Sequence, residues 1–186
     1  MDEAVKEAAV ARFLHEYSQI ERAASDHPAL LGCADVDWSQ IPGCPAGIPV
    51  LLRGLLDEVA GTEALRVLGN VLMDSIFHAS AAMPAALPFL IGLASVPDIA
   101  VRPGLVELLV VAAEVSSPVD AANERQVLLL GNDCDYPERE RVRAAFAAHA
   151  SALSALLEDE ALPDGLISAD DRECLLKAVE PQRHPS

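Results

Sequence analysis

The stretch NDCDYPERE, residues 132–140, gathers carboxylates at short spacing around Cys134. Carboxylates spaced in this way could bind a calcium ion, as they do in the loop of an EF-hand. The stretch lacks the glycine and the bidentate glutamate that an EF-hand loop carries at fixed positions. We therefore expect helix capping and a solvated acidic turn without a metal, and we keep Asp133, Asp135 and Tyr136 as candidate binding residues.

Asp74 is the best single candidate for a functional polar group. It is the only charged residue after Arg66 in a helix that we expect over residues 62–79. If its carboxylate faces inward, it should pair with Arg53 or Arg102, or else remain an unusual buried acid.

A segment rich in Pro, Gly and Asp, residues 25–45, is expected to be an irregular loop. Such a long loop in a compact domain usually packs against the core or binds a ligand. It contains Trp38, the only tryptophan of the chain, next to Asp37. We favour Trp38 as an anchor that fixes the loop to the helices. The alternative is a lid over a pocket lined by Asp37, Trp38 and Asp74.

The chain carries no glycine-rich nucleotide motif, no P-loop, no nucleophile elbow and no His-Glu-x-x-His motif. Its four cysteines are scattered without a C-x-x-C pair: Cys33, Cys44, Cys134 and Cys174. Free thiols are the favoured interpretation, and a zinc site assembled from distant parts is the alternative. We expect no catalytic residue, no metal and no cofactor.

The balance of charge narrows the classes of partner. The chain has 29 acidic and 13 basic side chains, with a formal net charge of -16. Nucleic acid and anionic membrane surfaces are disfavoured, because both bind mainly through Lys and Arg. A basic protein partner is allowed, although an acidic surface often serves solubility alone. Since we find neither a secretory signal nor a run of ~20 apolar residues for a membrane span, we expect a cytoplasmic protein.

The composition is 52% hydrophobic but only 4% aromatic, which favours an all-α fold. Apolar periodicity predicts a single domain over residues 1–186, with about eight helices, short links and no convincing strand. The expected helices span residues 2–24, 46–59, 62–79, 85–95, 103–115, 117–131, 137–158 and 168–180. The range 137–158 is either one helix or two with a break near Ala150, and residues 181–186 are expected to be a frayed tail.

Caps and breaks set the expected boundaries of these helices. Thr62, Ser117 and Ser168 are suited to N-cap positions. Pro103, Pro118 and Pro137 are suited to first turns, where their missing N–H costs nothing. Gly131 is suited to ending a helix.

The segment 87–113 resembles a HEAT repeat, which is a pair of antiparallel helices. LPFLIGLAS corresponds to the first helix, VPD to the turn and VRPGLVELLVVAA to the second helix, with Asp98, Val101 and Arg102 in matching places. Pro103 departs from the pattern and should start the second helix late. Similar pairs are expected at 46–79 and, stretched, at 142–180. With DWSQIP, PVLLRGLL and VLGN, the chain resembles a group of uncharacterised bacterial HEAT-like proteins, which implies a right-handed superhelix used for scaffolding or protein binding.

These observations predict a non-enzymatic helical scaffold that binds a protein partner through an acidic surface, one version being an inhibitor or immunity-type protein. The alternative is an enzyme or small-molecule binder with a pocket between helices near Asp74 and Trp38. A third possibility is an oligomeric subunit, if Val106, Val110 and Val111 lie exposed.

Overall fold

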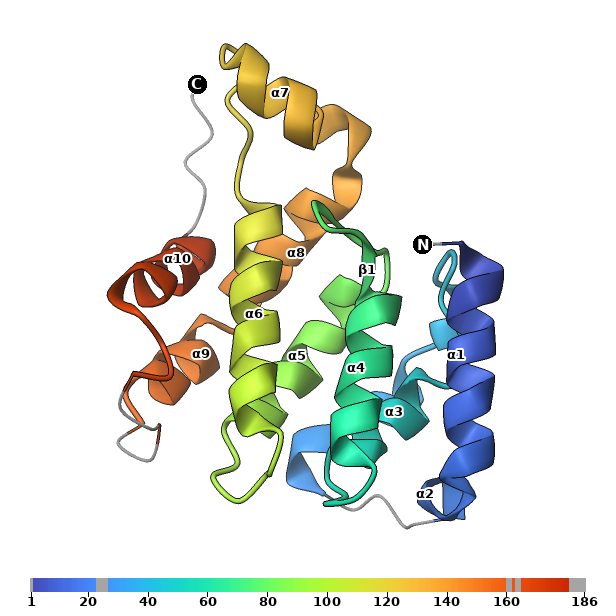
Figure 1. The fold of residues 1–186 in the computed structure, drawn as a ribbon. Helices are drawn as coiled ribbons and strands as arrows, with labels where there is room; N and C mark the ends of the chain where they lie inside the picture. The colour runs from blue at the N-terminus through green and yellow to red at the C-terminus, as the bar shows by residue number, and fades with distance from the viewer. Residues whose placement is uncertain (1, 23–26, 160–161, 163–164, 181–186) are drawn as a thin grey trace.

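The computed structural model describes residues 2–22, 27–159, 162 and 165–180, and this part of the chain is mostly helical (Figure 1). Helices α1 (Glu3–Glu16), α4 (Gly61–Leu72) and α6 (Arg102–Ser116) lie near the front of Figure 1. Helix α1 packs on α4, α4 packs on α6, and α6 packs on α10 (Ala169–Val179). This confirms the predicted all-α class.

The first expected helix is divided in two. Helix α1 ends before Tyr17, whose N–H still donates to the carbonyl oxygen of Phe13, and α2 (Ser18–Arg22) follows. The rings of Phe13 and Tyr17 pack together with their centroids 5.0 Å apart. Of the predicted range 2–24, residues 23 and 24 lie outside the described part.

The loop expected at 25–45 contains three short 3₁₀ helices, η1 (Pro28–Leu30), η2 (Cys33–Asp35) and η3 (Trp38–Gln40). Trp38 is only 4% exposed, its Nε1 donates to the carbonyl oxygen of Cys33 at 3.0 Å, and its ring lies against Phe89 of α5 (Met83–Ala94). The tryptophan therefore fixes the loop to a core helix. Helix α3 (Ile48–Gly54) then begins two residues later and ends five residues earlier than predicted.

The helix predicted over 62–79 is wrong at both ends. Its N-cap is Ala60 rather than Thr62, because Asp57 accepts the N–H groups of Val59 and Ala60. Helix α4 ends at Leu72, and the chain forms an antiparallel hairpin of β1 (Met73–Ser75) and β2 (His78–Ala79).

The hairpin has a local cause in Ser75. Its Oγ accepts the N–H of Phe77 and contacts Nδ1 of His78 at 2.8 Å. A serine that bonds nearby backbone competes with helical hydrogen bonding, so the apolar period beyond Leu72 does not continue as a helix. Ile76 is 80% exposed at the hairpin tip.

The helix pair that resembles a HEAT unit is present as α5 and α6, which run antiparallel in Figure 1. Four apolar side chains of α5 are buried: Leu87, Leu90, Ile91 and Ala94. Pro103 lies in the first turn of α6, as predicted, and Pro84 lies in the first turn of α5. Pro88 lies inside α5, so this helix accommodates a proline beyond its first turn.

Helix α7 (Glu124–Leu130) starts later than predicted, and the proposed cap at Ser117 is wrong. The hydroxyl of Ser117 donates instead to the carbonyl oxygen of Ala113 at the end of α6. Asn123 is the N-cap of α7, and its side chain accepts the N–H of Gln126.

The C-terminal part agrees better with the prediction. The range 137–158 is two helices, α8 (Pro137–Ala148) and α9 (Ala150–Leu157), which are separated at His149. Ser168 and Asp171 form the capping box that starts α10. No helix in the described residues has the length and apolar character needed to cross a membrane.

Candidate functional site

The sequence-predicted site residues lie in three separate places. Asp37 is exposed and accepts the hydroxyl of Ser39 at 2.6 Å, whereas the neighbouring Trp38 is buried against Phe89. Asp74 lies on β1 and pairs with Lys6 of α1, whereas Trp38 packs against α5. Sequence reasoning could not place these residues because they belong to different elements, far apart in the chain.

Asp74 pairs with a lysine rather than with either expected arginine. Its Oδ1 lies 2.5 Å from Nζ of Lys6 on α1, and that ammonium also donates to the carbonyl oxygen of Val71 at 2.9 Å. Lys6 is buried while the Asp74 side chain is about half exposed. Arg102 instead donates to the carbonyl oxygen of Ala94 and pairs with Asp159.

Asp133 is held by two arginines of α8. Its carboxylate lies 2.6 Å from Arg139 and 3.3 Å from Arg143. Arg139 is buried and also donates to the carbonyl oxygens of Leu130 and Val115. These contacts join the ends of α6 and α7 to α8, so the cluster is a structural connection.

Tyr136 belongs to the same connection. Its ring stacks on His78 with the centroids 3.9 Å apart, and the Arg139 guanidinium lies 5.5 Å from the ring centroid. Nε2 of His78 lies 3.1 Å from the carbonyl oxygen of Leu130, which can only accept, so Nε2 carries a proton. Asp135 is exposed and accepts from Asn132 at 3.2 Å.

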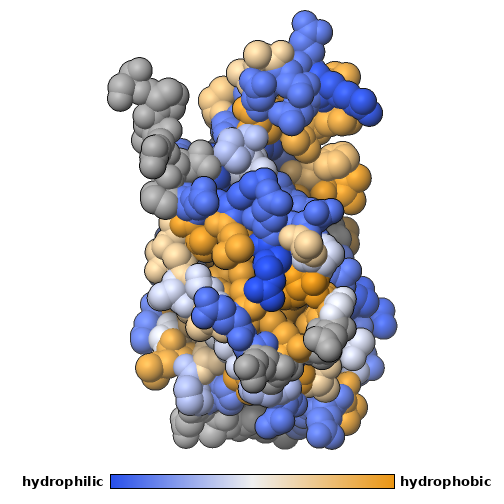
Figure 2. Space-filling view, turned by 90° about the vertical axis from the view of Figure 1, so that its left-hand side faces the viewer, coloured by the Kyte–Doolittle hydropathy of each residue, from blue (hydrophilic) through white to orange (hydrophobic). Residues whose placement is uncertain are grey.

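A groove along the outer face of α6 was not predicted as a site. Its volume is about 370 Å³. Hydrophobic residues also gather in the middle of the face that Figure 2 shows. We call the groove the α6 groove and define it by its lining residues: Pro103, Val106, Glu107, Val110, Val111, Glu114, Leu166 and Asp171.

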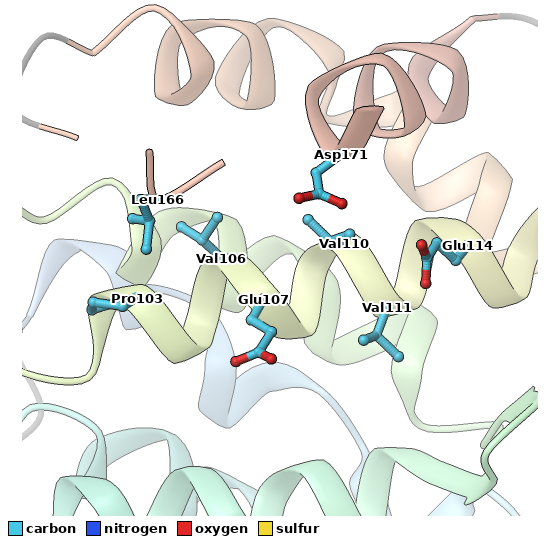
Figure 3. Close-up of a pocket in the computed structure, with 8 residues that line it drawn as sticks. All are labelled: Pro103, Val106, Glu107, Val110, Val111, Glu114, Leu166 and Asp171. Carbon is cyan, nitrogen blue, oxygen red and sulfur yellow. The ribbon is translucent and has the colours of Figure 1, made fainter. Parts of the chain in front are cut away.

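The lining of the α6 groove combines aliphatic side chains with carboxylates. Val110 points toward the side chain of Asp171 on α10, and Val106 points to the same side of α6, next to Leu166, while Glu107 and Val111 point to the other side (Figure 3). The spacing explains this arrangement, since residues four apart share a helix face. Val106, Val110 and Val111 together give α6 apolar surface on both of these sides.

The α6 groove has a negative electrostatic environment. Its lining contains three carboxylates and no Lys, Arg or His. Burial raises the pKa of the nearby Cys174 thiol on α10, and the carboxylates of Glu114 and Asp171 raise it further, because a thiolate would be repelled by both. Within the described residues, none of the ion pairs involves Glu107 or Glu114. Their charges are therefore available to a cation.

The cysteines are separate thiols, as favoured from the sequence. Cys33 is buried, Cys44 and Cys174 are partly buried, and Cys134 is exposed. Burial raises the pKa of Cys44 to about 11, with a smaller opposing effect from Lys6. No group of three or more His, Cys, Asp or Glu side chains in the described residues is arranged to hold a metal ion.

Comparisons with protein-family models, with curated proteins and with solved structures found no match to this chain.

Proposed function

We propose that this protein is a non-enzymatic helical scaffold that binds a protein partner through the α6 groove. The observation that carries the proposal is the composition of the groove, in which an aliphatic floor is bordered by Glu107, Glu114 and Asp171 without any basic residue. Apolar contact would supply affinity, and the carboxylates would select a basic surface and speed association.

A binding role is favoured over catalysis by the side chains that the groove offers. Its lining contains no His, Cys, Ser or Lys that could act with a carboxylate as a nucleophile or base. Its aliphatic surface is suited to excluding water from a contact rather than to polarising a bond.

We further propose that the fold is a short HEAT-like stack. The antiparallel pair α5–α6 and the neighbouring α3–α4 segment support this. One version of the function is an inhibitor or immunity-type protein that masks a basic surface of a toxin. The net charge of -16 would favour such a partner at low ionic strength.

The test is affinity capture from the cells of origin at low and at high salt. The wild-type chain is compared with a variant carrying Glu107→Lys and Glu114→Lys. A matched control carries Glu3→Lys and Glu7→Lys, two exposed positions on α1 that change the net charge equally. We expect one partner to bind the wild type and the control but not the groove variant. Equal capture by all three proteins, or by none, would contradict the proposal.

A further inference from the structure

We propose that the partner presents a single basic amphipathic helix, about three turns long, that lies along α6. This inference rests on the proposed function, because it names the kind of segment that the α6 groove receives. Its starting observation is the set of aliphatic and acidic side chains that α6 displays over Pro103–Glu114.

The backbone around the α6 groove favours a helix over an extended segment. The groove lies between α6 and α10, and the backbone groups within a helix are already bonded to one another. An extended segment gains affinity by pairing with a free strand edge. The strands of the described residues, β1 and β2, contribute no residue to the groove lining. A partner must therefore bind through its side chains, as a helix does when it lies in a groove.

The length of the α6 groove sets the length of the partner helix. Pro103 and Glu114 are eleven residues apart on α6, which corresponds to about 16 Å at the rise of an α-helix. A partner helix of about 11–12 residues would cover this distance.

The spacing of the carboxylates sets the sequence pattern of the partner. Glu107 and Glu114 are seven residues apart, or two helical turns, and Val110 and Val111 lie between them. A matching helix carries two Lys or Arg residues two turns apart, with apolar residues in the intervening turn. Asp171 lies on the α10 side of Val110 and can accept a third cation (Figure 3).

A second copy of this chain is a poorer occupant of the α6 groove. Each copy carries a formal net charge of -16, so two copies repel one another. The arginines of the α8 cluster are also engaged within the chain, since Arg139 and Arg143 bind Asp133. Charge therefore favours a basic partner over self-association.

The test uses a synthetic alanine-based helical peptide with two lysines two turns apart and a pair of leucines between them. Two control peptides replace the lysines by glutamates, or place a proline in the middle so that the same residues cannot form a helix. Binding to the full chain is measured by fluorescence anisotropy, together with protection of Cys174 from alkylation. Sedimentation of the free chain follows self-association.

We expect the basic helical peptide to bind at least about tenfold more tightly than either control, as two ion pairs and a preformed helix would produce. Protein carrying Glu107→Gln and Glu114→Gln should lose this preference, while Glu3→Gln with Glu7→Gln should keep it. The helical peptide should also slow alkylation of Cys174.

Three outcomes would overturn the inference, and they separate it from the proposed function. Equal binding of the proline peptide would mean that the groove takes basic segments without a helix, so the proposed function would stand. If none of the peptides binds, the inference of a helical partner segment is rejected. The capture experiment would still decide whether a protein binds the groove. Self-association that protects Cys174 would make a second copy the occupant and contradict both.

Discussion

Nζ of Lys6 lies 2.5 Å from Oδ1 of Asp74 and joins the first helix to the hairpin that follows α4. The two residues are 68 positions apart in the chain. The ammonium is buried whereas the carboxylate is about half exposed, so the two partners do not depend equally on the pair.

This asymmetry predicts unequal costs for the two single substitutions. Asp74→Asn removes the carboxylate that stabilises a buried ammonium and should lower the free energy of unfolding by about 1–3 kcal/mol. Lys6→Met should cost less than Asp74→Asn, about 1 kcal/mol, because Met fills the site and water can solvate Asp74, so that the main loss is the hydrogen bond to the carbonyl oxygen of Val71. Denaturant unfolding of both variants checks this. Equal costs would mean that the ion pair does not stabilise Lys6.

Arg139 should be the most sensitive arginine of α8. Arg139→Lys keeps the charge but cannot reach Asp133, Leu130 and Val115 together, so we expect a loss of about 2–3 kcal/mol. The control is Arg141→Lys, since Arg141 is exposed and its contact with Glu138 is 3.7 Å long. The control should change stability by less than about 0.5 kcal/mol. Thermal unfolding of the two variants distinguishes a structural cluster from a surface pair.

Gly131 should be intolerant of any side chain. Its φ of 69° and ψ of 171° define a region that is essentially restricted to glycine, and an added Cβ would lie 2.3 Å from Cε2 of Tyr136. Gly131→Ala should cost about 2–3 kcal/mol. Gly43 also has a positive φ but nothing within 4 Å of an added Cβ, so Gly43→Ala should cost about 1 kcal/mol. Similar costs at both positions would argue against the close contact with Tyr136.

The elements that sequence predicted well are those with local causes. The cap at Ser168 and the first-turn prolines Pro103 and Pro137 depend on neighbours a few residues away. Pro118, also predicted in a first turn, is wrong, because it lies before the start of α7. The helix predicted over 62–79 was wrong because the spacing of apolar residues does not indicate the turn at Ser75. The same spacing does not indicate the contacts that Lys6 and the end of α7, both distant in the chain, make with the hairpin.

The α6 groove could be predicted only in part. The valines and glutamates of α6 are visible in the sequence as an extended apolar surface bordered by acids. The other wall comes from Leu166 and Asp171, more than fifty residues later, and no periodicity places α10 beside α6. For the same reason, Asp133 was predicted as a binding residue although Arg139 and Arg143 occupy its carboxylate.

The negative environment of the α6 groove can be measured through Cys174. Glu114→Gln removes a carboxylate that disfavours the thiolate, so the pKa of Cys174 should fall. Alkylation should therefore become faster at pH values below the ordinary thiol pKa of 9.0, because the thiolate is the reactive form. Mass spectrometry of the Cys174 peptide gives the rate. Glu7→Gln on α1 is the control with equal net charge, and equal rates in both variants would argue against a local effect.

A partner that binds the α6 groove should form a crosslink to a photoreactive residue placed in that groove. The most direct measurement is site-specific photo-crosslinking in the cells of origin, with a photoreactive phenylalanine derivative at Val111 in the α6 groove or at Val5, which is exposed on α1. The scaffold account predicts one crosslinked protein at Val111, little at Val5, and loss of the product when Glu107→Lys and Glu114→Lys are added. Equal products at both positions, or a product at Val111 that survives the charge reversal, would contradict it.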